Sequence, residues 1–404
     1  MSDRRRLLKA MAGVGILAPI PGAWSQQNPG PAGLPAGALE SAAWGTLPGK
    51  LPLIKRSWRP PNFETPTRYF NELFTPNDAF FVRYHLSNIP TVEAAEWRLR
   101  IGGDAVERAS ELSLTDLQRD YPVVELAAVC QCSGNRRGLS DPHVPGVQWG
   151  YGAMGNARWK GVRLKDVLAK AGVTSGAMEV AFDGADSGAS EATPDFVKSL
   201  PAWKALDEDT LLAWEMNGAA LPHWNGFPVR LVVPGWTATY WMKHLVSVQV
   251  LAQPLKGFWM NPAYRVPKRR FPVIDRFVSQ ETEANTPITE MVVNSLITNL
   301  RDGMLYKANS PLFVRGIAWD GGYGIAGVEV SVDGGRTWSL ATLGEDAGRY
   351  SWRPWSFAFN PKPGEHTVMA KATNRAGATQ TSDLIFNPAG YHNNVVQRLK
   401  IICA

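Results

Sequence analysis

The residues best suited to chemistry in this sequence lie in the run Val129–Arg137, which reads VCQCSGNRR. Cys132 is followed within five residues by Arg136 and Arg137, after a Ser-Gly-Asn turn. A thiolate is a soft metal ligand, and neighbouring guanidinium groups lower the pKa of a cysteine and attract anions. The run therefore indicates a metal ligand beside an anion-binding site. The alternative is a buried cysteine that ends a strand, followed by arginines that face the solvent.

Three further segments carry residues that suit anion binding. In the apolar segment Phe80–Leu86, Arg83 and His85 are two residues apart, so they project from the same side of a strand. Arg230 lies in a second apolar segment, and Tyr264 follows an Asn-Pro-Ala turn. Each of these residues alone is most often structural. Their occurrence together with the cysteine favours a shared site.

The composition is that of a globular protein with more than one domain. The chain has 404 residues, of which 45% are hydrophobic and 19% charged. Three cysteines are too few for a disulfide framework, and the sequence has neither zinc-ligand spacing nor a C-x-x-C-H motif for covalently bound haem. Beyond the first ten residues, the one basic run is Lys268–Arg270, so nucleic-acid binding is not indicated.

The amino-terminus has the pattern of an export signal. Arg4 and Arg5 precede two leucines and a lysine, and the weakly apolar stretch Ala10–Ala23 follows. This stretch is too short and too rich in Gly and Pro for stable membrane insertion. We therefore expect residues 1–25 to be a twin-arginine signal peptide, cleaved after Ser25, and the folded protein to be exported to the periplasm. Cleavage would lower the formal charge from +6 to +3.

The remaining chain divides into three parts by its residue patterns. Residues 26–60 are rich in Pro, Gly and Ala, which predicts an extended arm without its own core. Residues 61–285 mix short strands, such as Trp97–Ile101, with short helices, which predicts an α+β domain. One helix is expected to start after a Thr115 cap, and another to end at Gly172.

The pattern changes after residue 285. Val328–Val332 alternates apolar and polar residues, and Asp333–Gly335 then forms a hairpin turn. His366–Ala372 is a second strand of this kind. The regular spacing of short strands predicts an immunoglobulin-like β-sandwich over residues 286–404.

Several motifs together resemble those of one enzyme family. Cys132–Arg137, CSGNRR, resembles the Cys-Ala-Gly-Asn-Arg-Arg run of the sulfite oxidases, a family of molybdenum enzymes. Further motifs of that family occur in the same order, namely FFVRYH, LAWEMNG, NGFPVRLVVPG and VEVSVDGG-TW. The resemblance covers roughly residue 60 to the carboxyl terminus. With the export signal, it extends to the catalytic subunits of bacterial periplasmic sulfite dehydrogenases.

The resemblance implies a cofactor and its contacts. The cofactor would be molybdenum bound by a pyranopterin and by the thiolate of Cys132, and no role follows for Cys130. The positions that match the family's pterin contacts are Tyr84, His85, Asp186, Asn225, Arg230 and Lys243. Arg230 and Lys243 would bind the cofactor phosphate. Asn225 departs from the family's usual histidine, and it can donate a hydrogen bond but carries no charge.

The resemblance also implies a reaction and partners. Arg83, Arg137 and Tyr264, with His85 adjacent, match the family's sulfite pocket, in which Tyr264 would orient substrate rather than act as a base. The implied reaction is oxidation of sulfite to sulfate by oxo transfer at the molybdenum. The resemblance places no haem in this chain, so the electrons would pass singly to a separate c-type cytochrome. The sandwich would mediate homodimerisation, or a cytochrome subunit would replace the second copy.

Three alternatives remain at this point. The first is a sulfane dehydrogenase that oxidises carrier-bound sulfur on the same framework. A methionine sulfoxide reductase of the superfamily has less support, because the carboxyl-terminal sandwich would have no use there. The third is an exported binding module without catalytic activity, for which stoichiometric molybdenum would be contrary evidence.

Overall fold

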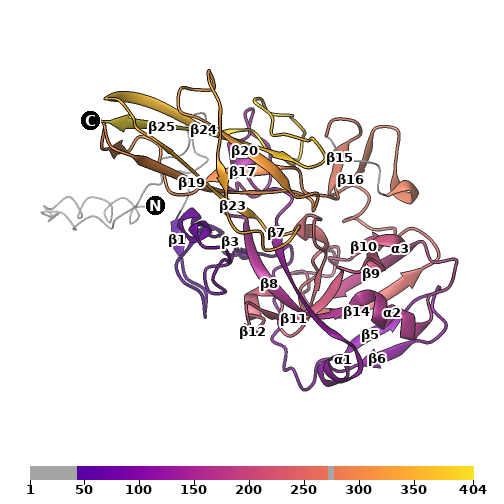
Figure 1. The fold of residues 1–404 in the computed structure, drawn as a ribbon. Coiled ribbons are helices and arrows are strands. Elements are labelled where there is room, and N and C mark those ends of the chain that lie inside the picture. The colour runs from indigo at the N-terminus through magenta and orange to yellow at the C-terminus, as the bar shows by residue number, and fades with distance from the viewer. Residues whose placement is uncertain (1–42, 272–276) are drawn as a thin grey trace, which may run out of the picture.

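The computed structural model describes residues 43–271 and 277–404, so the predicted signal peptide lies outside the described residues. Figure 1 shows a sandwich of orange and yellow strands at one end of the molecule and two further sheets at the other, and the long strands β7 and β8 of one of these sheets extend toward the sandwich. None of the helices in the described ranges has the length and apolar character needed to cross a membrane.

The first sheet contains the described part of the predicted arm. Its strand order follows the sequence: β1 (Ala43–Gly45), β2 (Leu53–Ser57), β3 (Asn62–Glu64) and β4 (Val82–Arg83). The buried side chains of Leu47 and Leu53 pack with Phe63, Val82 and Tyr84 in a small core. From residue 43 onward, the segment therefore differs from the expected arm without a core, because its few leucines have partners in residues 61–84.

A five-stranded mixed sheet follows. Its order is β10 (Lys198–Pro201), β9 (Glu179–Gly184), β14 (Leu245–Leu251), β5 (Leu99–Gly102) and β6 (Ser110–Leu112). β14 and β5 pair in parallel, and the other pairs are antiparallel. β5 corresponds to the predicted strand Trp97–Ile101 and begins two residues later.

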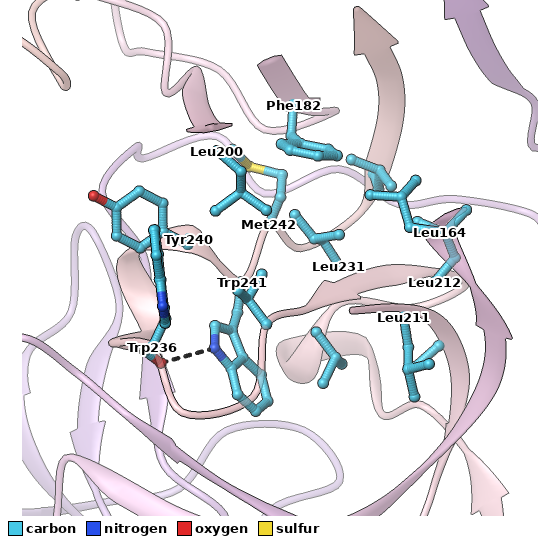
Figure 2. Packing of buried hydrophobic residues seen from close by; sticks show 14 of the residues in the cluster. Leu164, Phe182, Leu200, Leu211, Leu212, Leu231, Trp236, Tyr240, Trp241 and Met242 are labelled. Atoms are coloured by element: carbon cyan, nitrogen blue, oxygen red, sulfur yellow. Dashed lines mark hydrogen bonds between the residues drawn. The ribbon is translucent and has the colours of Figure 1, made fainter. Parts of the chain in front are cut away.

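A second sheet of this region carries the cysteine run. Its order is β12 (Ala219–Ala220), β11 (Leu211–Met216), β8 (Met154–Arg163) and β7 (Val123–Gln131), and β13 (Arg230–Val232) also pairs with β11. Leu212 and Leu231 from this sheet share one core with Phe182 and Leu200 of the mixed sheet (Figure 2). Because β7 ends at Gln131, its pairing with β8 sets the position of Cys132.

The helices are few and short, so the region is richer in sheet than a typical α+β domain. They are α1 (Leu114–Asp120), α2 (Leu164–Ala171) and α3 (Ala202–Ala205), with 3₁₀ turns at Thr67–Asn71, Arg137–Leu139, His223–Asn225, Ala238–Tyr240 and Val278–Gln280. Ser113 caps α1 in place of the expected Thr115, since Asp116 completes a reciprocal capping box with it. α2 ends at Gly172, as predicted, in a left-handed conformation.

Two sheets form the carboxyl-terminal region, after the hairpin of β15 (Arg265–Pro267) and β16 (Asn285–Pro287). One sheet has the order β17 (Asn294–Ile297), β19 (Leu312–Trp319), β23 (Arg353–Phe359) and β22 (Thr342–Leu343). The other has the order β18 (Leu305–Tyr306), β25 (Gln397–Cys403), β24 (Gly364–Asn374), β20 (Ile325–Ser331) and β21 (Ser339–Leu340).

The two carboxyl-terminal sheets share a core, so the region is a β-sandwich. Val314 and Trp355 of one sheet pack with Val330, Val368 and Ile401 of the other. The predicted strand 366–372 lies in β24, and the predicted strand 328–332 overlaps β20, which ends one residue earlier at Ser331. The immunoglobulin-like class of the sandwich and the exact domain boundaries remain predictions.

A separate cluster of buried side chains joins the sandwich to the preceding sheets. Its core members are Phe70, Val129, Met154, Met291, Leu296, Ile317, Trp319 and Trp352. Trp319 Nε1 also donates a hydrogen bond of 2.6 Å to Gln131 Oε1, next to Cys132. The sandwich is therefore packed directly against the strand that carries the cysteine run.

This junction predicts the effect of Trp352→Ala. Trp352 is fully buried and packs edge-on against Phe70, so its truncation should lower the free energy of unfolding by about 3–5 kcal/mol. Trp58→Ala is the matched control, because Trp58 is 53% exposed. Urea unfolding of both variants tests the expectation, and equal losses of stability would contradict it.

Candidate cofactor and anion site

One cavity collects most of the predicted site residues. It holds about 610 Å³ of space free of protein atoms, part of which is open to the solvent. Its walls include Cys132 from the end of β7, Arg83 from β4, and Arg230 from β13. The segment after β4 contributes His85, so Arg83 and His85 share one side as predicted.

Cys132 is held at the cavity wall by its main chain. Its N–H donates to the Ala153 carbonyl at 2.9 Å, and Asn135 Oδ1 accepts from the Ala153 N–H at 3.0 Å. The side chain is 7% exposed and its thiol is free. Cys130, two residues earlier in β7, also lines the cavity, and Arg230 Nη2 lies 3.8 Å from its Sγ. Burial raises the pKa of the Cys130 thiol.

His85 and Tyr264 form a contact pair in the cavity. His85 Nε2 is hydrogen-bonded to the Tyr264 hydroxyl, and its ring stacks on Phe196 with centroids 3.7 Å apart. Burial holds the pKa of His85 well below 6.5, and the charges of Arg83, Lys243 and Lys198 lower it further. The lowered pKa favours the neutral imidazole of His85 at neutral pH.

Tyr264 lies in a left-handed backbone conformation, with φ of 58°. Its carbonyl accepts from the Ile288 N–H at 2.8 Å, and its ring stacks on Tyr391 with centroids 5.5 Å apart. Burial raises the pKa of Tyr264, and the nearby Arg83 guanidinium opposes this shift. The raised pKa favours the protonated hydroxyl at neutral pH, and the role of Tyr264 in orienting substrate stays a prediction.

Arg137 is placed behind the cavity and not in its wall. Its Nε donates to the Ala389 carbonyl at 2.7 Å and its Nη1 to the Val147 carbonyl at 3.1 Å. The guanidinium carbon lies 5.4 Å from the centre of the Tyr391 ring, which stacks on Tyr264. Direct contact of Arg137 with a substrate therefore remains a prediction, while its charge lies close enough to lower the pKa of Tyr264.

Three glycines make room for the Arg137 side chain. A Cβ at Gly134 would meet the guanidinium group, one at Gly146 would lie 3.0 Å from Nη1, and one at Gly390 would lie 2.8 Å from Cγ. Gly134 belongs to the CSGNRR run. This glycine is therefore needed for the position of Arg137, and not for a special backbone angle.

Five of the six predicted pterin contacts line the cavity, while Tyr84 does not. The five are His85, Asp186, Asn225, Arg230 and Lys243. Tyr84 lies behind them, with Lys243 Nζ 4.3 Å from its ring centre and its hydroxyl 2.7 Å from His244 Nε2. Tyr84 therefore supports Lys243, and its direct contact with the cofactor remains a prediction.

The chemistry of the wall fits a polar, anionic group. Ser133 Oγ, Arg230 Nε and Thr239 Oγ1 are buried without a hydrogen-bond partner, and all three residues line the cavity. Such orphaned atoms are costly unless a ligand satisfies them. Burial also lowers the pKa of Lys243 to about 8, a shift that a bound anion would offset. Among the described residues, no three His, Cys, Asp or Glu side chains cluster as ligands of a metal ion.

Several residues of the site could not be inferred from the sequence. The cavity walls also include Phe80, Phe81, Ser133, Phe196, Trp224, Ala238, Thr239, Trp241 and Met242. Ser133 could have been inferred as a site residue, since it follows Cys132 directly in the sequence. The others are common core residues whose role depends on long-range packing, and two buried lysines that contact the site, Lys50 and Lys198, have no motif.

Comparisons with known proteins identify the family of the two main regions of the chain. Residues 85–259 match the oxidoreductase molybdopterin binding domain, and residues 285–404 match the Mo-co oxidoreductase dimerisation domain. Sulfite oxidase of Gallus gallus is 37% identical over 332 residues, covering 79% of this chain and 70% of the relative. Mitochondrial sulfite oxidase of Macaca fascicularis is 34% identical over 374 residues, covering 88% and 67%. The chain thus spans about two thirds of the length of these relatives.

A solved structure is similar over nearly the whole chain. The sulfane dehydrogenase SoxCD from Paracoccus pantotrophus superposes with a TM-score of 0.74 at 25% identity, covering 96% of this chain and 95% of that chain. The fold and the site define a molybdopterin-dependent oxidoreductase. The chain belongs to the sulfite oxidase family, and its cofactor is molybdenum bound by a pyranopterin.

The close contact between Gly134 and the Arg137 guanidinium predicts the effect of Gly134→Ala. The new methyl group should displace the Arg137 guanidinium and weaken binding of an oxyanion such as sulfate about tenfold, because one charge leaves its position. Calorimetric titration of the cofactor-loaded protein with sulfate measures this effect. Gly176→Ala is the matched control, since its nearest neighbour would be 3.9 Å away. Equal sulfate affinity in both variants would contradict the expectation.

Proposed function

We propose that this chain oxidises sulfite to sulfate and passes the electrons one at a time to a c-type cytochrome. The observation that carries the proposal is the cavity in which Cys132, only 7% exposed, faces the same space as Arg83, Arg230 and Lys243. A small dianion suits such an enclosed, positively charged space. The sulfite oxidases among the relatives support the same substrate.

The residues of the site would have different roles in this reaction. When bound, the cofactor supplies oxo transfer and takes up two electrons. Cys132 would provide the protein thiolate ligand. Arg83 would hold the sulfite oxygens, with Arg137 adding positive charge from behind Tyr391. Neutral His85 and protonated Tyr264, which share a hydrogen bond, would orient the anion and hold a proton between them.

The proposal also includes a cellular location and an electron acceptor. The twin-arginine pattern at residues 1–25 supports export to the periplasm. The motifs shared with bacterial sulfite dehydrogenases support a c-type cytochrome as acceptor, either as a tight subunit or as a diffusing partner.

A second candidate is oxidation of carrier-bound sulfane sulfur. The similarity to the sulfane dehydrogenase SoxCD over 96% of the chain favours it. The low exposure of Cys132 favours a small free anion instead, because a protein-bound substrate needs an open approach. The two candidates differ in whether free sulfite is a substrate.

We expect the purified, cofactor-loaded protein to reduce ferricytochrome c rapidly when sulfite is added, with or without oxygen. Absorbance at the cytochrome α band measures the rate. Cys132→Ala should abolish almost all turnover, because the single protein ligand is lost. If molybdenum is present and only carrier-bound sulfane supports reduction, the second candidate holds and the first is wrong.

Arg83→Gln tests the anion pocket. The substitution removes a charged donor and should raise the KM for sulfite about ten- to hundredfold while molybdenum is retained. Steady-state kinetics and metal analysis measure both quantities. Arg68→Gln is the matched control, because Arg68 is exposed and lies over Trp44. An unchanged KM and kcat/KM for Arg83→Gln would remove Arg83 from the pocket.

A further inference from the structure

Lys50 is a buried lysine outside every predicted site and both matched domains. It follows β1 in the first sheet and is 6% exposed. Its N–H donates to the Leu47 carbonyl at 2.9 Å, and the next N–H, of Leu51, donates to the Asp78 carbonyl at 3.0 Å. These bonds fix the turn, so the side chain enters the protein at a defined place.

The ammonium group of Lys50 ends at the wall of the cofactor cavity. Its Nζ donates to the carbonyls of Asn77 at 2.6 Å and Phe80 at 3.1 Å, and to Asn225 Oδ1 at 2.5 Å. All three acceptors are neutral, so the hydrogen bonds use the three donors without cancelling the charge. Burial lowers the pKa of Lys50 to about 7, against the influence of Asp78, and a nearby anion would favour the charged form.

Asn225 connects Lys50 to the cofactor contacts. Its Nδ2 donates to the Phe81 carbonyl at 3.2 Å, and its own carbonyl accepts from Arg230 Nη1 at 2.9 Å. Phe81, Asn225 and Arg230 all line the cavity. The Asn225 side chain is oriented by its bonds to Lys50 and to the Phe81 carbonyl, and the bond to Lys50 is the shorter of the two.

We propose that Lys50 is a positioning residue for the molybdenum-pyranopterin cofactor. It locks Asn225, and through the Asn225 main chain it holds Arg230 in the cavity wall, so that the cofactor leaves slowly. The amino-terminal sheet thereby takes part in cofactor retention. The inference rests on the cofactor and not on the substrate, so its outcome is independent of the sulfite assay.

Loss of molybdenum from the purified protein tests the proposal. Lys50→Met removes the hydrogen bonds and the charge, while Lys50→Gln keeps two donors and removes the charge. We expect the molybdenum and pterin that stay bound to the protein, measured after successive gel filtrations, to fall about tenfold faster in Lys50→Met than in the unchanged protein. Lys55→Met is the matched control, because Lys55 lies on β2 of the same sheet, partly exposed over Trp58 at 5.3 Å.

Thermal unfolding separates this role from a merely structural one. Protein made without the cofactor should unfold at nearly the same temperature in the Lys50 variants and in Lys55→Met, while the stabilisation by bound cofactor should shrink in the Lys50 variants. If Lys50→Met does not fold, Lys50→Gln carries the same test. The proposal is overturned if the Lys50 variants retain cofactor as well as Lys55→Met, or if the cofactor-free and loaded forms lose equal stability.

Discussion

The cavity depends on positive charge that the protein itself does not neutralise. Arg83, Arg230 and Lys243 face one space, and Asp186 is the one carboxylate among the described residues that line it. Buried cations without anionic partners are unfavourable, which agrees with the lowered pKa values of Arg230 and Lys243. The strands and turns around the cavity therefore hold several buried cations close together. A bound anion would offset the free-energy cost of burying them. The orphaned donors of the wall have the same explanation.

The carboxyl-terminal sandwich is part of this arrangement and not an appendage to it. Arg136 Nη1 donates to Asn294 Oδ1 at 2.6 Å, and Asn393 Nδ2 donates to the Arg136 carbonyl at 3.1 Å. The adjacent Tyr391 stacks on Tyr264. The two arginines of the CSGNRR run thus have different contacts. Arg136 is hydrogen-bonded to the sandwich, and Arg137 lies near the site. A shift of Tyr391 in the sandwich would therefore move both rings and charges near the site, because Tyr391 stacks on Tyr264 and lies against Arg137.

Local periodicity accounts for the parts of the site that could be predicted. The i, i+2 spacing predicted that Arg83 and His85 share one side, and both line the cavity while Tyr84 between them does not. Comparable local rules predicted the end of α2 and the hairpin after β20. Long-range packing escaped prediction: the first sheet takes up residues read as an arm, and Lys50 reaches Asn225 across 175 positions. Such contacts leave no pattern in a single sequence.

The protonation of His85 links the charge of the cavity to its occupancy. Arg83, Lys243 and Lys198 all lower its pKa, in addition to burial, so the imidazole is neutral while only the protein's charges act on it. An anion bound among these cations reduces their effect on the ring and raises the pKa of His85 toward its ordinary value. Because His85 Nε2 is hydrogen-bonded to the Tyr264 hydroxyl, a proton gained by the ring changes which group of this pair donates. An anion among these cations therefore affects the protonation of His85 through their charges, and the hydrogen bond extends this effect to Tyr264.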